Sequence, residues 1–393
     1  MALPRLLAVG EGLSPTGYAR VMESVLEPLS RVFEVTLFAI NAHGAAASRP
    51  PRSFAVRGNS LPGDRFGVEQ LGPLLEELDP DVVLLHGNSS FHLMHRETLA
   101  AYRARRPGAR VVVYCPADWP EQVPAVTASL AAVDLLVMYT PHGLETVSRA
   151  FTAAGLGLPP TAVIPHGVDC SRFAPMHRAE ARERLFGSAR LDDAFIVLNA
   201  NRSQRRKRID LTLQAFAAFA SDRPDAWLYL HMGMRDLGGD VLGMADSLGI
   251  AGRLLTTTRE AAHPRVPDEQ LRLIYNACDV GLNTASAEGW GLVSFEHACT
   301  GAVQVVPAGA ACASLWEGAG LVTAPERAAD ALAKLYDNPE LRASLGRRCL
   351  ELARSPEFRW EAIAARWSEV LLASVRSSSD AVGDPRRAEA PAA

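Results

Sequence analysis

Two glutamates flank a glycine-rich turn in the second half of the chain. Glu288 and Glu296 are separated by seven residues in the stretch ASAEGWGLVSFEHACTG, residues 285–301. Apolar residues after the turn recur at helical spacing, so the turn is predicted to lead into a helix that Gly301 ends. Backbone amides of a first helical turn favour a phosphate, and the neighbouring carboxylates accept hydrogen bonds from hydroxyls. A nucleoside diphosphate sugar supplies both groups.

The glutamates alone have an equally good structural explanation, as a loop carboxylate and a first-turn partner of the helix dipole. A second group of charged residues favours the functional explanation. In LNANRSQRRKRIDL, Arg202 and Lys207 follow a predicted strand over 195–200. Open α/β sheets bind ligands at the carboxyl ends of their strands, and these cations could neutralise a diphosphate leaving group there. Three neighbouring arginines are predicted to face solvent instead: Arg205, Arg206 and Arg208.

The elements that would position these loops alternate between short β-branched runs and amphipathic stretches. The runs include LLAVG, DVVLLH and RVVVYC in the first half and AFIVLNA, DVGLNT and AVQVVP in the second. This rhythm predicts an α/β protein with parallel sheets covered by helices. We place two domains at residues 1–169 and 170–356, followed by a helix over 357–375 and a flexible tail over 376–393. The stretch 41–64 lacks periodicity and is predicted to be a long loop.

Composition and charge exclude several classes of protein. Of the 393 residues, 48% are hydrophobic and 21% are charged, and no apolar run reaches the length of a membrane span. The net charge of −4 gives no global attraction to nucleic acid, so no nucleic-acid partner is expected. The six cysteines are scattered without CxxC spacing, which is typical of small buried side chains in a reducing compartment.

The expected location is cytoplasmic, because the first residues lack the apolar core and the cleavage site of a signal peptide. One stretch, RETLAAYRARRPGAR, is strongly basic. It is interpreted first as a solvated helix face, and peripheral contact with the inner membrane face is the alternative.

Three stretches resemble the motifs of one enzyme family. NANRSQRRKRID and SAEGWGLVSFEHACTG resemble the R-x4-K and E-x7-E signatures of retaining glycosyltransferase family 4, which has the GT-B fold, and VIPHGVD resembles its hinge motif. The resemblance covers almost the whole chain. It implies two Rossmann-like domains facing across a cleft, with the helix over 357–375 packing back on the N-terminal domain. It also implies transfer of a sugar, with a hexose expected, from a nucleotide-diphosphate sugar to a hydroxyl acceptor with retention.

The resemblance also implies roles for individual residues. Arg202 and Lys207 would bind the donor diphosphate. Glu288 would hold a hydroxyl of the donor sugar, and Glu296 would hold the ribose. Trp290 stands where the family often has Phe or Tyr, which indicates packing and leaves its part in specificity open. The complete donor-binding set is Gly17, Arg202, Lys207, Glu288, Gly289, Trp290, Gly291, Leu292, Val293 and Glu296.

The acceptor side would come from the first domain. Thr16 and Gly17 lie where similar enzymes shape the acceptor site, although a simple strand-to-helix turn explains them equally well. Asp118 and Trp119 follow a predicted strand and are expected at the cleft rim. The family often has a histidine in this neighbourhood, so either Asp118 or His86 would act on the acceptor hydroxyl. Asp118 could instead cap the next helix. The predicted catalytic set is Arg202, Lys207, Glu288 and Asp118.

No metal or other cofactor is predicted, because the histidines form no ligand cluster and HExxH spacing is absent. The expected partners are a nucleotide sugar and a hydroxyl on a saccharide, a lipid-linked group, a protein or a small molecule. The donor base, the sugar and the oligomeric state stay open. Two alternatives also stay open: a sugar phosphorylase or synthase of the same fold, and a non-catalytic subunit that binds nucleotide sugars.

Overall fold

The computed structural model describes residues 2–14, 16–43, 52–117, 123–187 and 191–383. The chain divides into two compact units, each described here by itself. The N-terminal unit consists of Met1–Gly167 and Trp360–Ala393, and the C-terminal unit consists of Val168–Arg359. The C-terminal unit is therefore inserted into the sequence of the N-terminal one. Its two ends are neighbours, because the amide of Val168 donates to the carbonyl of Phe358 at 2.8 Å.

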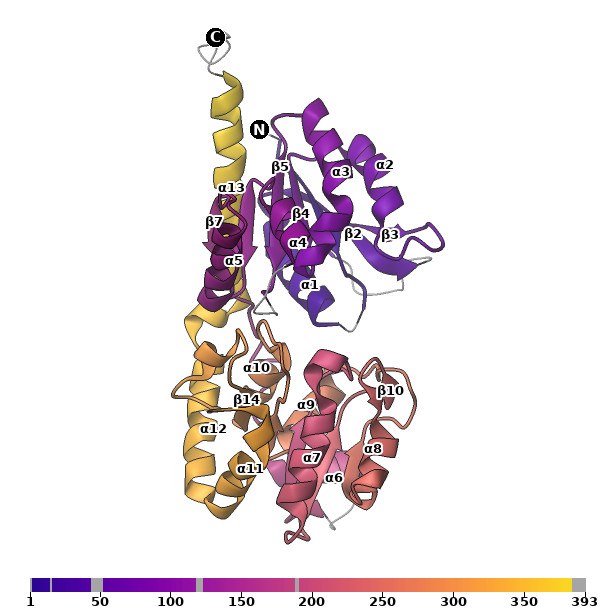
Figure 1. Ribbon diagram of the computed structural model, residues 1–393, viewed down its shortest axis with the longest axis vertical. Coiled ribbons are helices and arrows are strands. Elements are labelled where there is room, and N and C mark those ends of the chain that lie inside the picture. The colour runs from indigo at the N-terminus through magenta and orange to yellow at the C-terminus, as the bar shows by residue number, and fades with distance from the viewer. Residues whose placement is uncertain (1, 15, 44–51, 118–122, 188–190, 384–393) are drawn as a thin grey trace. The chain divides into compact units, whose positions relative to one another are not determined.

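The N-terminal unit is built around a seven-stranded sheet in the order β3-β2-β1-β4-β5-β6-β7 (Figure 1). All of its strand pairs are parallel. The strands are β1 Arg5–Gly10, β2 Glu34–His43, β3 Ala55–Asn59, β4 Val82–His86, β5 Arg110–Cys115, β6 Leu135–Met138 and β7 Thr161–Val163. The helices that follow them are α1 Gly17–Leu29, α2 Val68–Leu78, α3 Ser89–Arg105, α4 Pro124–Leu130 and α5 Pro141–Ala153. Helices cover both faces, which is why the central strands are buried apolar runs.

The C-terminal unit has a six-stranded parallel sheet in the order β12-β9-β8-β13-β14-β15. Its strands are β8 Phe195–Asn199, β9 Ala226–Leu230, β12 Leu254–Thr256, β13 Val280–Leu282, β14 Val303–Pro307 and β15 Leu321–Thr323. Its helices are α6 Arg178–Phe186, α7 Ile209–Ala220, α8 Val241–Ser247, α9 Asp268–Ala277, α10 Leu292–Ala298, α11 Ala328–Asp337 and α12 Pro339–Ala353. A two-stranded hairpin, β10 Arg235–Asp236 and β11 Gly239–Asp240, lies after β9. The predicted class, two parallel-sheet α/β domains, is confirmed.

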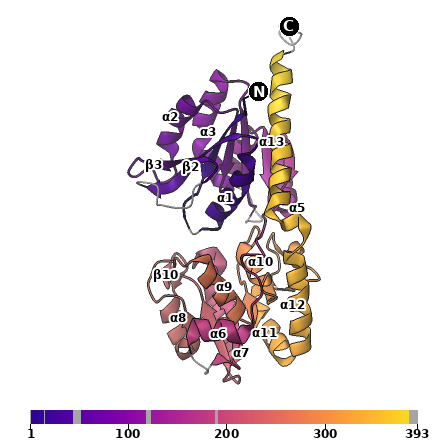
Figure 2. The ribbon, with the colours of Figure 1, turned by 180° about the vertical axis from the view of Figure 1, so that it is seen from behind.

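The last helix, α13 Trp360–Gly383, belongs to the N-terminal unit (Figure 2). Trp367 is fully buried and meets the ring of Tyr114 edge-on, with 4.8 Å between the centroids. Farther along the helix, the guanidinium of Arg110 donates to the carbonyl of Ser374 at 3.2 Å. The helix passes the predicted end at residue 375, so the expectation of a flexible tail from residue 376 is wrong as far as Gly383. No proline or glycine interrupts residues 376–382, so their sequence allows the helix to continue.

The predicted long loop over 41–64 contains regular structure. Strand β2 continues to His43, and β3 pairs with it in parallel at the sheet edge. Residues 44–51 lie outside the described part of the chain. The sequence Ala-Val-Arg-Gly-Asn of β3 has little apolar content, so the strand exists because β2 supplies hydrogen-bonding partners.

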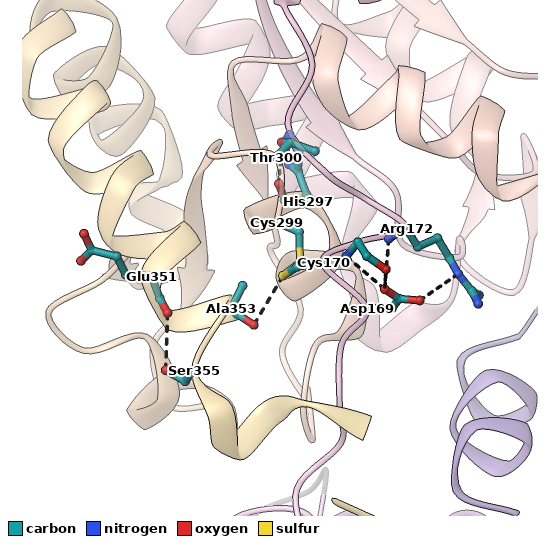
Figure 3. Close-up of a disulfide and its surroundings, with 10 residues drawn as sticks. Asp169, Cys170, Arg172, His297, Cys299, Thr300, Glu351, Ala353 and Ser355 are labelled. Atoms are coloured by element: carbon teal, nitrogen blue, oxygen red, sulfur yellow. Dashed lines mark hydrogen bonds and ion pairs between the residues drawn. A yellow bond between two sulfur atoms is a disulfide. The ribbon is translucent and has the colours of Figure 1, made fainter. Parts of the chain in front are cut away.

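Two of the six cysteines depart from the prediction of small, unlinked side chains. Cys170 and Cys299 form a disulfide within the C-terminal unit (Figure 3). The remaining four are buried and form no disulfide among the described residues: Cys115, Cys278, Cys312 and Cys349. Sequence spacing could not reveal the pair, because its members are 129 residues apart and meet only in the folded unit. None of the described helices is long and apolar enough to cross a bilayer.

Candidate functional site

The basic loop and the glutamate turn meet at one edge of the C-terminal sheet. β8 and β13 are parallel neighbours, so the loops that follow them leave from the same edge. Hydrogen bonds join the two loops. The amide of Ser286 donates to the carbonyl of Arg206 at 2.8 Å, and the hydroxyl of Thr284 donates to the carbonyl of Arg208 at 2.9 Å. Two segments that lie far apart in the sequence are thus held together at this edge of the sheet.

Where these two loops meet, the ammonium of Lys207 donates to Oε2 of Glu288. Both side chains are buried, with 7% and 6% of the residues exposed. Lys207 also donates to Oδ1 of Asn201 at 2.9 Å, and the amide of Asn283 donates to the same carboxylate oxygen at 3.3 Å. A buried ion pair is held in place when hydrogen bonds satisfy its remaining groups, so Lys207 and Glu288 have fixed positions.

Opposing effects act on the carboxyl of Glu288. Burial alone would raise its pKa, but the charges of Lys207 and Arg206 and the hydrogen bond from Lys207 outweigh burial, and the pKa is lowered. Glu288 is therefore a carboxylate that accepts hydrogen bonds at neutral pH. It is not a proton donor at that pH.

Arg206 contradicts the prediction that it faces solvent. Its guanidinium donates to the carbonyl of Ala287 at 2.9 Å and lies 3.9 Å from Oε1 of Glu288. Of the other two arginines in this group, Arg205 is exposed, and Arg208 forms an ion pair with Asp210. Composition alone could not separate the three, because the separation depends on the position of the glutamate turn.

Buried polar side chains, linked by hydrogen bonds, connect the two loops to each other and to helix α7. Asn199 accepts from the amide of Asn201 at 3.0 Å and donates to the hydroxyl of Thr212 at 2.8 Å. Thr212 in turn shares a 2.6 Å hydrogen bond with Thr284. Sequence reasoning missed these residues. Their signal is the pair of polar endings, Asn-Ala-Asn after β8 and Asn-Thr after β13, which interrupt buried apolar runs.

Arg202 does not contact the Lys207–Glu288 pair directly. Its Nε donates to Oδ2 of Asp236 at 2.8 Å, and 51% of its side chain is exposed. Asp236 lies on the β10–β11 hairpin, which docks on the basic loop because the amide of Gly238 donates to the carbonyl of Ser203 at 3.1 Å. Burial raises the pKa of Asp236, but hydrogen bonds from the Leu237 amide and Arg202 outweigh it, so the pKa is lowered.

The remaining residues predicted to bind the donor lie before and within α10, which has seven residues. Gly291 precedes the helix with φ +86°, a left-handed conformation that favours glycine, and Leu292 and Val293 open its first turn. Glu296 is buried and accepts from the hydroxyl of Tyr275 at 2.8 Å. Trp290 stacks on Phe295 with 4.9 Å between centroids, which fits the packing role expected of it. Gly289 is buried in the turn between Glu288 and Trp290.

Comparison with known proteins shows that the C-terminal half of the chain is similar to glycosyltransferases. Residues 240–369 match the family model described as "Glycosyl transferase-like". A D-inositol 3-phosphate glycosyltransferase of Arthrobacter sp. strain FB24 is 30% identical over 230 residues, which are 57% of this chain and 52% of that protein. The chain spans about half the length of the first relatives it matches.

Solved structures agree over nearly the whole chain. Sucrose-phosphate synthase from Thermosynechococcus elongatus matches with a TM-score of 0.76 and 18% identity, covering 96% of this chain and 100% of that one. The Anabaena protein HepE, in complex with UDP and glucose, matches with a TM-score of 0.72 and 16% identity, covering 94% and 100%. This chain has the GT-B fold, and its sequence is similar to glycosyltransferases. The recognition made from its motifs is confirmed.

The N-terminal unit of this GT-B protein holds the residues predicted on the acceptor side. Thr16 caps α1 by accepting from the amide of Ala19 at 3.2 Å, and Gly17 is the first helical residue. Both thus occupy the strand-to-helix turn that was the alternative explanation. Asp118 and Trp119 lie outside the described residues, so their predicted roles stay predictions.

His86 ends strand β4, as predicted, but it lies in the protein interior. It is 2% exposed, shares a 3.0 Å hydrogen bond with the hydroxyl of Tyr139, and stacks on Tyr114. Burial lowers its pKa to about 3, so its ring is neutral at pH 7. These contacts hold His86 in the packing beneath the strand ends.

No three metal-binding side chains gather among the residues that the structure describes. The prediction of a reaction without a metal rests on the sequence and stays a prediction.

Proposed function

We propose that this GT-B protein transfers a hexosyl group from a nucleoside-diphosphate hexose to a hydroxyl acceptor, with retention of the anomeric configuration. The observation that carries the proposal is the convergence of Lys207 and Glu288, which brings a phosphate-binding cation and a hydroxyl-binding carboxylate to the same point. A nucleoside-diphosphate hexose carries its diphosphate on the anomeric carbon and its nearest hydroxyl on the next ring carbon. Lys207 and Glu288 lie close enough together for the ammonium to bind the phosphate while the carboxylate accepts from that hydroxyl.

The proposed catalysis is electrostatic. The bond between the anomeric carbon and the phosphate oxygen breaks, the acceptor oxygen bonds to the same face of that carbon, and the acceptor proton passes to the departing phosphate oxygen. Lys207 and Arg202 stabilise the charge that grows on the departing diphosphate, in a site where the ammonium is already oriented. Glu288 is an anion at neutral pH and receives hydrogen bonds from the donor sugar. It forms no covalent bond with the sugar.

The proposed donor is a UDP-hexose, and the first acceptor class to test is a phosphorylated sugar or polyol. The Anabaena structure contains UDP and glucose, and the Arthrobacter relative is a D-inositol 3-phosphate glycosyltransferase. The proposed reaction needs no metal, and the proposed location is cytoplasmic. Peripheral membrane contact remains an alternative for a lipid-linked acceptor.

Calorimetric titration with UDP, GDP, UDP-glucose and glucose 1-phosphate tests the donor class. We expect UDP and UDP-glucose to bind wild-type protein and Lys207→Ala to lose at least most of that binding. Tight binding of glucose 1-phosphate without nucleotide would instead favour a phosphorylase. Slow hydrolysis of bound UDP-glucose in the absence of an acceptor is also expected, and its absence would favour a non-catalytic binding subunit. Proton NMR of the glucose first released from UDP-glucose shows whether the anomeric configuration is retained.

A further inference from the structure

The disulfide joins the beginning of the C-terminal unit to the end of the helix that carries Glu296. Cys170 is two residues beyond Val168, where the C-terminal unit begins. Cys299 is the C-cap residue of α10, and its amide donates to the carbonyl of Phe295 at 3.1 Å. Figure 3 shows the two sulfurs bonded between the initial segment and the helix end. The Cα atoms of the pair are 5.0 Å apart.

The two sulfurs differ in their access to solvent. Cys299 is fully buried, whereas Cys170 is only partly buried and its sulfur also contacts the carbonyl of Ala353 at 3.5 Å. A thiol arriving from solvent would therefore meet Cys170 first. The other four cysteines are all buried, so among the described residues the Cys170–Cys299 pair is the sulfur site most accessible to a thiol from solvent.

We propose that Cys170 and Cys299 form a reversible thiol–disulfide site that exchanges with small or protein dithiols. In reduction, a thiolate of the dithiol attacks the Cys170 sulfur and forms a mixed disulfide, while the Cys299 sulfur leaves and takes a proton. The second thiol of the reductant then displaces Cys170, which also takes a proton. The products are two cysteine thiols and the oxidised dithiol. Exchange with a small disulfide such as oxidised glutathione reverses the reaction.

The initial segment stays anchored when the bond opens. Oδ1 of Asp169 accepts from the amides of Ser171 and Arg172, each at 3.0 Å, and the amide of Val168 donates to Phe358. None of these hydrogen bonds involves the sulfurs. The reduced protein is therefore expected to keep its fold and to lose the restraint that the closed loop places on the unfolded chain.

Packing connects the disulfide to the glutamate turn. Cys299 follows Phe295 by one helical turn, and Phe295 stacks on Trp290, two residues after Glu288. Cys312 adds a second contact with the turn, since its amide donates to the carbonyl of Glu288 at 3.2 Å. Opening the disulfide frees the far end of α10. We expect this to weaken nucleotide binding by about fivefold, a typical coupling between sites. This second consequence rests on the proposed function.

The test uses the full chain in buffers poised with reduced and oxidised glutathione. Alkylation under denaturing conditions should count four free thiols in the oxidised protein and six in the reduced protein. Oxidation should raise the melting temperature of the C-terminal unit by about 5–10 °C. Cys170→Ser should melt like the reduced wild type in both buffers. Cys312→Ala, which changes a buried free cysteine, should keep the redox dependence.

Six free thiols in every buffer, or a melting temperature that is independent of redox state, would overturn the proposal. UDP titration of both forms tests the coupling separately. Equal UDP affinities, with a melting shift present, would overturn the coupling and leave the exchange site. Failure of both forms to bind UDP, with the thiol counts as expected, would refute the proposed function alone.

Discussion

Lys207 donates a hydrogen bond to Glu288 from a position 81 residues earlier in the chain. The ion pair is buried, so each charge depends on the other for compensation. The pair therefore contributes to stability as well as to the proposed ligand binding, and a substitution that removes one charge is expected to alter both. Experiments on this site need variants that separate the two effects.

Substitution Lys207→Met should destabilise the C-terminal unit by about 3–5 kcal/mol, because it leaves the Glu288 carboxylate buried without its cation. Denaturant unfolding followed by fluorescence measures this loss. The double variant Lys207→Met with Glu288→Gln removes both charges. It should recover most of the stability but should still fail to bind UDP. Recovery of UDP binding in the double variant would show that the pair has a structural role only.

Asp236 fixes the direction of the Arg202 guanidinium, which we propose binds the donor diphosphate. The hydrogen bond from Nε leaves the two terminal nitrogens of the guanidinium to present to phosphate oxygens. Asp236→Ala should therefore weaken UDP binding by about fivefold, which is close to 1 kcal/mol. Asp240→Ala is the matched control, since it removes an exposed ion pair with Arg235 in the same hairpin. Equal effects of the two variants on UDP affinity would mean that the hairpin matters and the Arg202 contact does not.

Arg206→Ala and Arg205→Ala form a second matched pair. Arg206 holds the carbonyl of Ala287 and lies near Glu288, whereas Arg205 is exposed. Arg206→Ala should cost about 1–2 kcal/mol of unfolding free energy, and Arg205→Ala should cost almost none. Thermal melts of the two proteins measure the difference. A larger loss for Arg205→Ala would contradict the position assigned to Arg206.

Buried histidines should make the protein sensitive to acid. Burial lowers the pKa of His86 and of His297 to about 3, below the ordinary value of 6.5. Between pH 3 and pH 6.5, each of these two histidines binds a proton in the unfolded chain but not in the folded protein. Falling pH should therefore lower the unfolding free energy by about 1.4 kcal/mol per pH unit for each ring.

Denaturant unfolding at several values between pH 7 and pH 5 measures this slope. His297→Gln keeps a neutral polar side chain and should reduce the slope for the C-terminal unit by one proton. His142→Gln, on the partly exposed surface of α5, is the control variant. An unchanged slope in His297→Gln would show that His297 is protonated in the folded protein.

Helix α7 shows what the sequence can predict. Ile209, Leu213 and Phe216 recur at helical spacing and are all buried, and the helix has the predicted ends at Ile209 and Ala220. This signal is local, so it needs no knowledge of the rest of the fold. Strand β3 was missed because its residues form a strand only through pairing with β2. The pairing of Cys170 with Cys299 is equally non-local.

In the candidate site, too, some features could be predicted from local sequence and others could not. Residue types and spacing were enough to select Lys207 and Glu288, because a cation and a carboxylate each followed a buried strand. The directions of the arginine side chains could not be predicted. Arg202 turns toward Asp236, and Arg206 toward the carbonyl of Ala287, and both partners come from distant segments. Side-chain direction here is a property of the assembled loops.

The neighbouring ends of the C-terminal unit have a practical consequence. Val168 and Phe358 share a backbone hydrogen bond. A separately expressed fragment of residues 168–359 would therefore have its two ends next to each other. Those termini lie close enough for a short linker to close the excised piece into a ring or to permit circular permutation. Such a fragment would carry both loops of the candidate site and the cystine on a polypeptide of about half the original length.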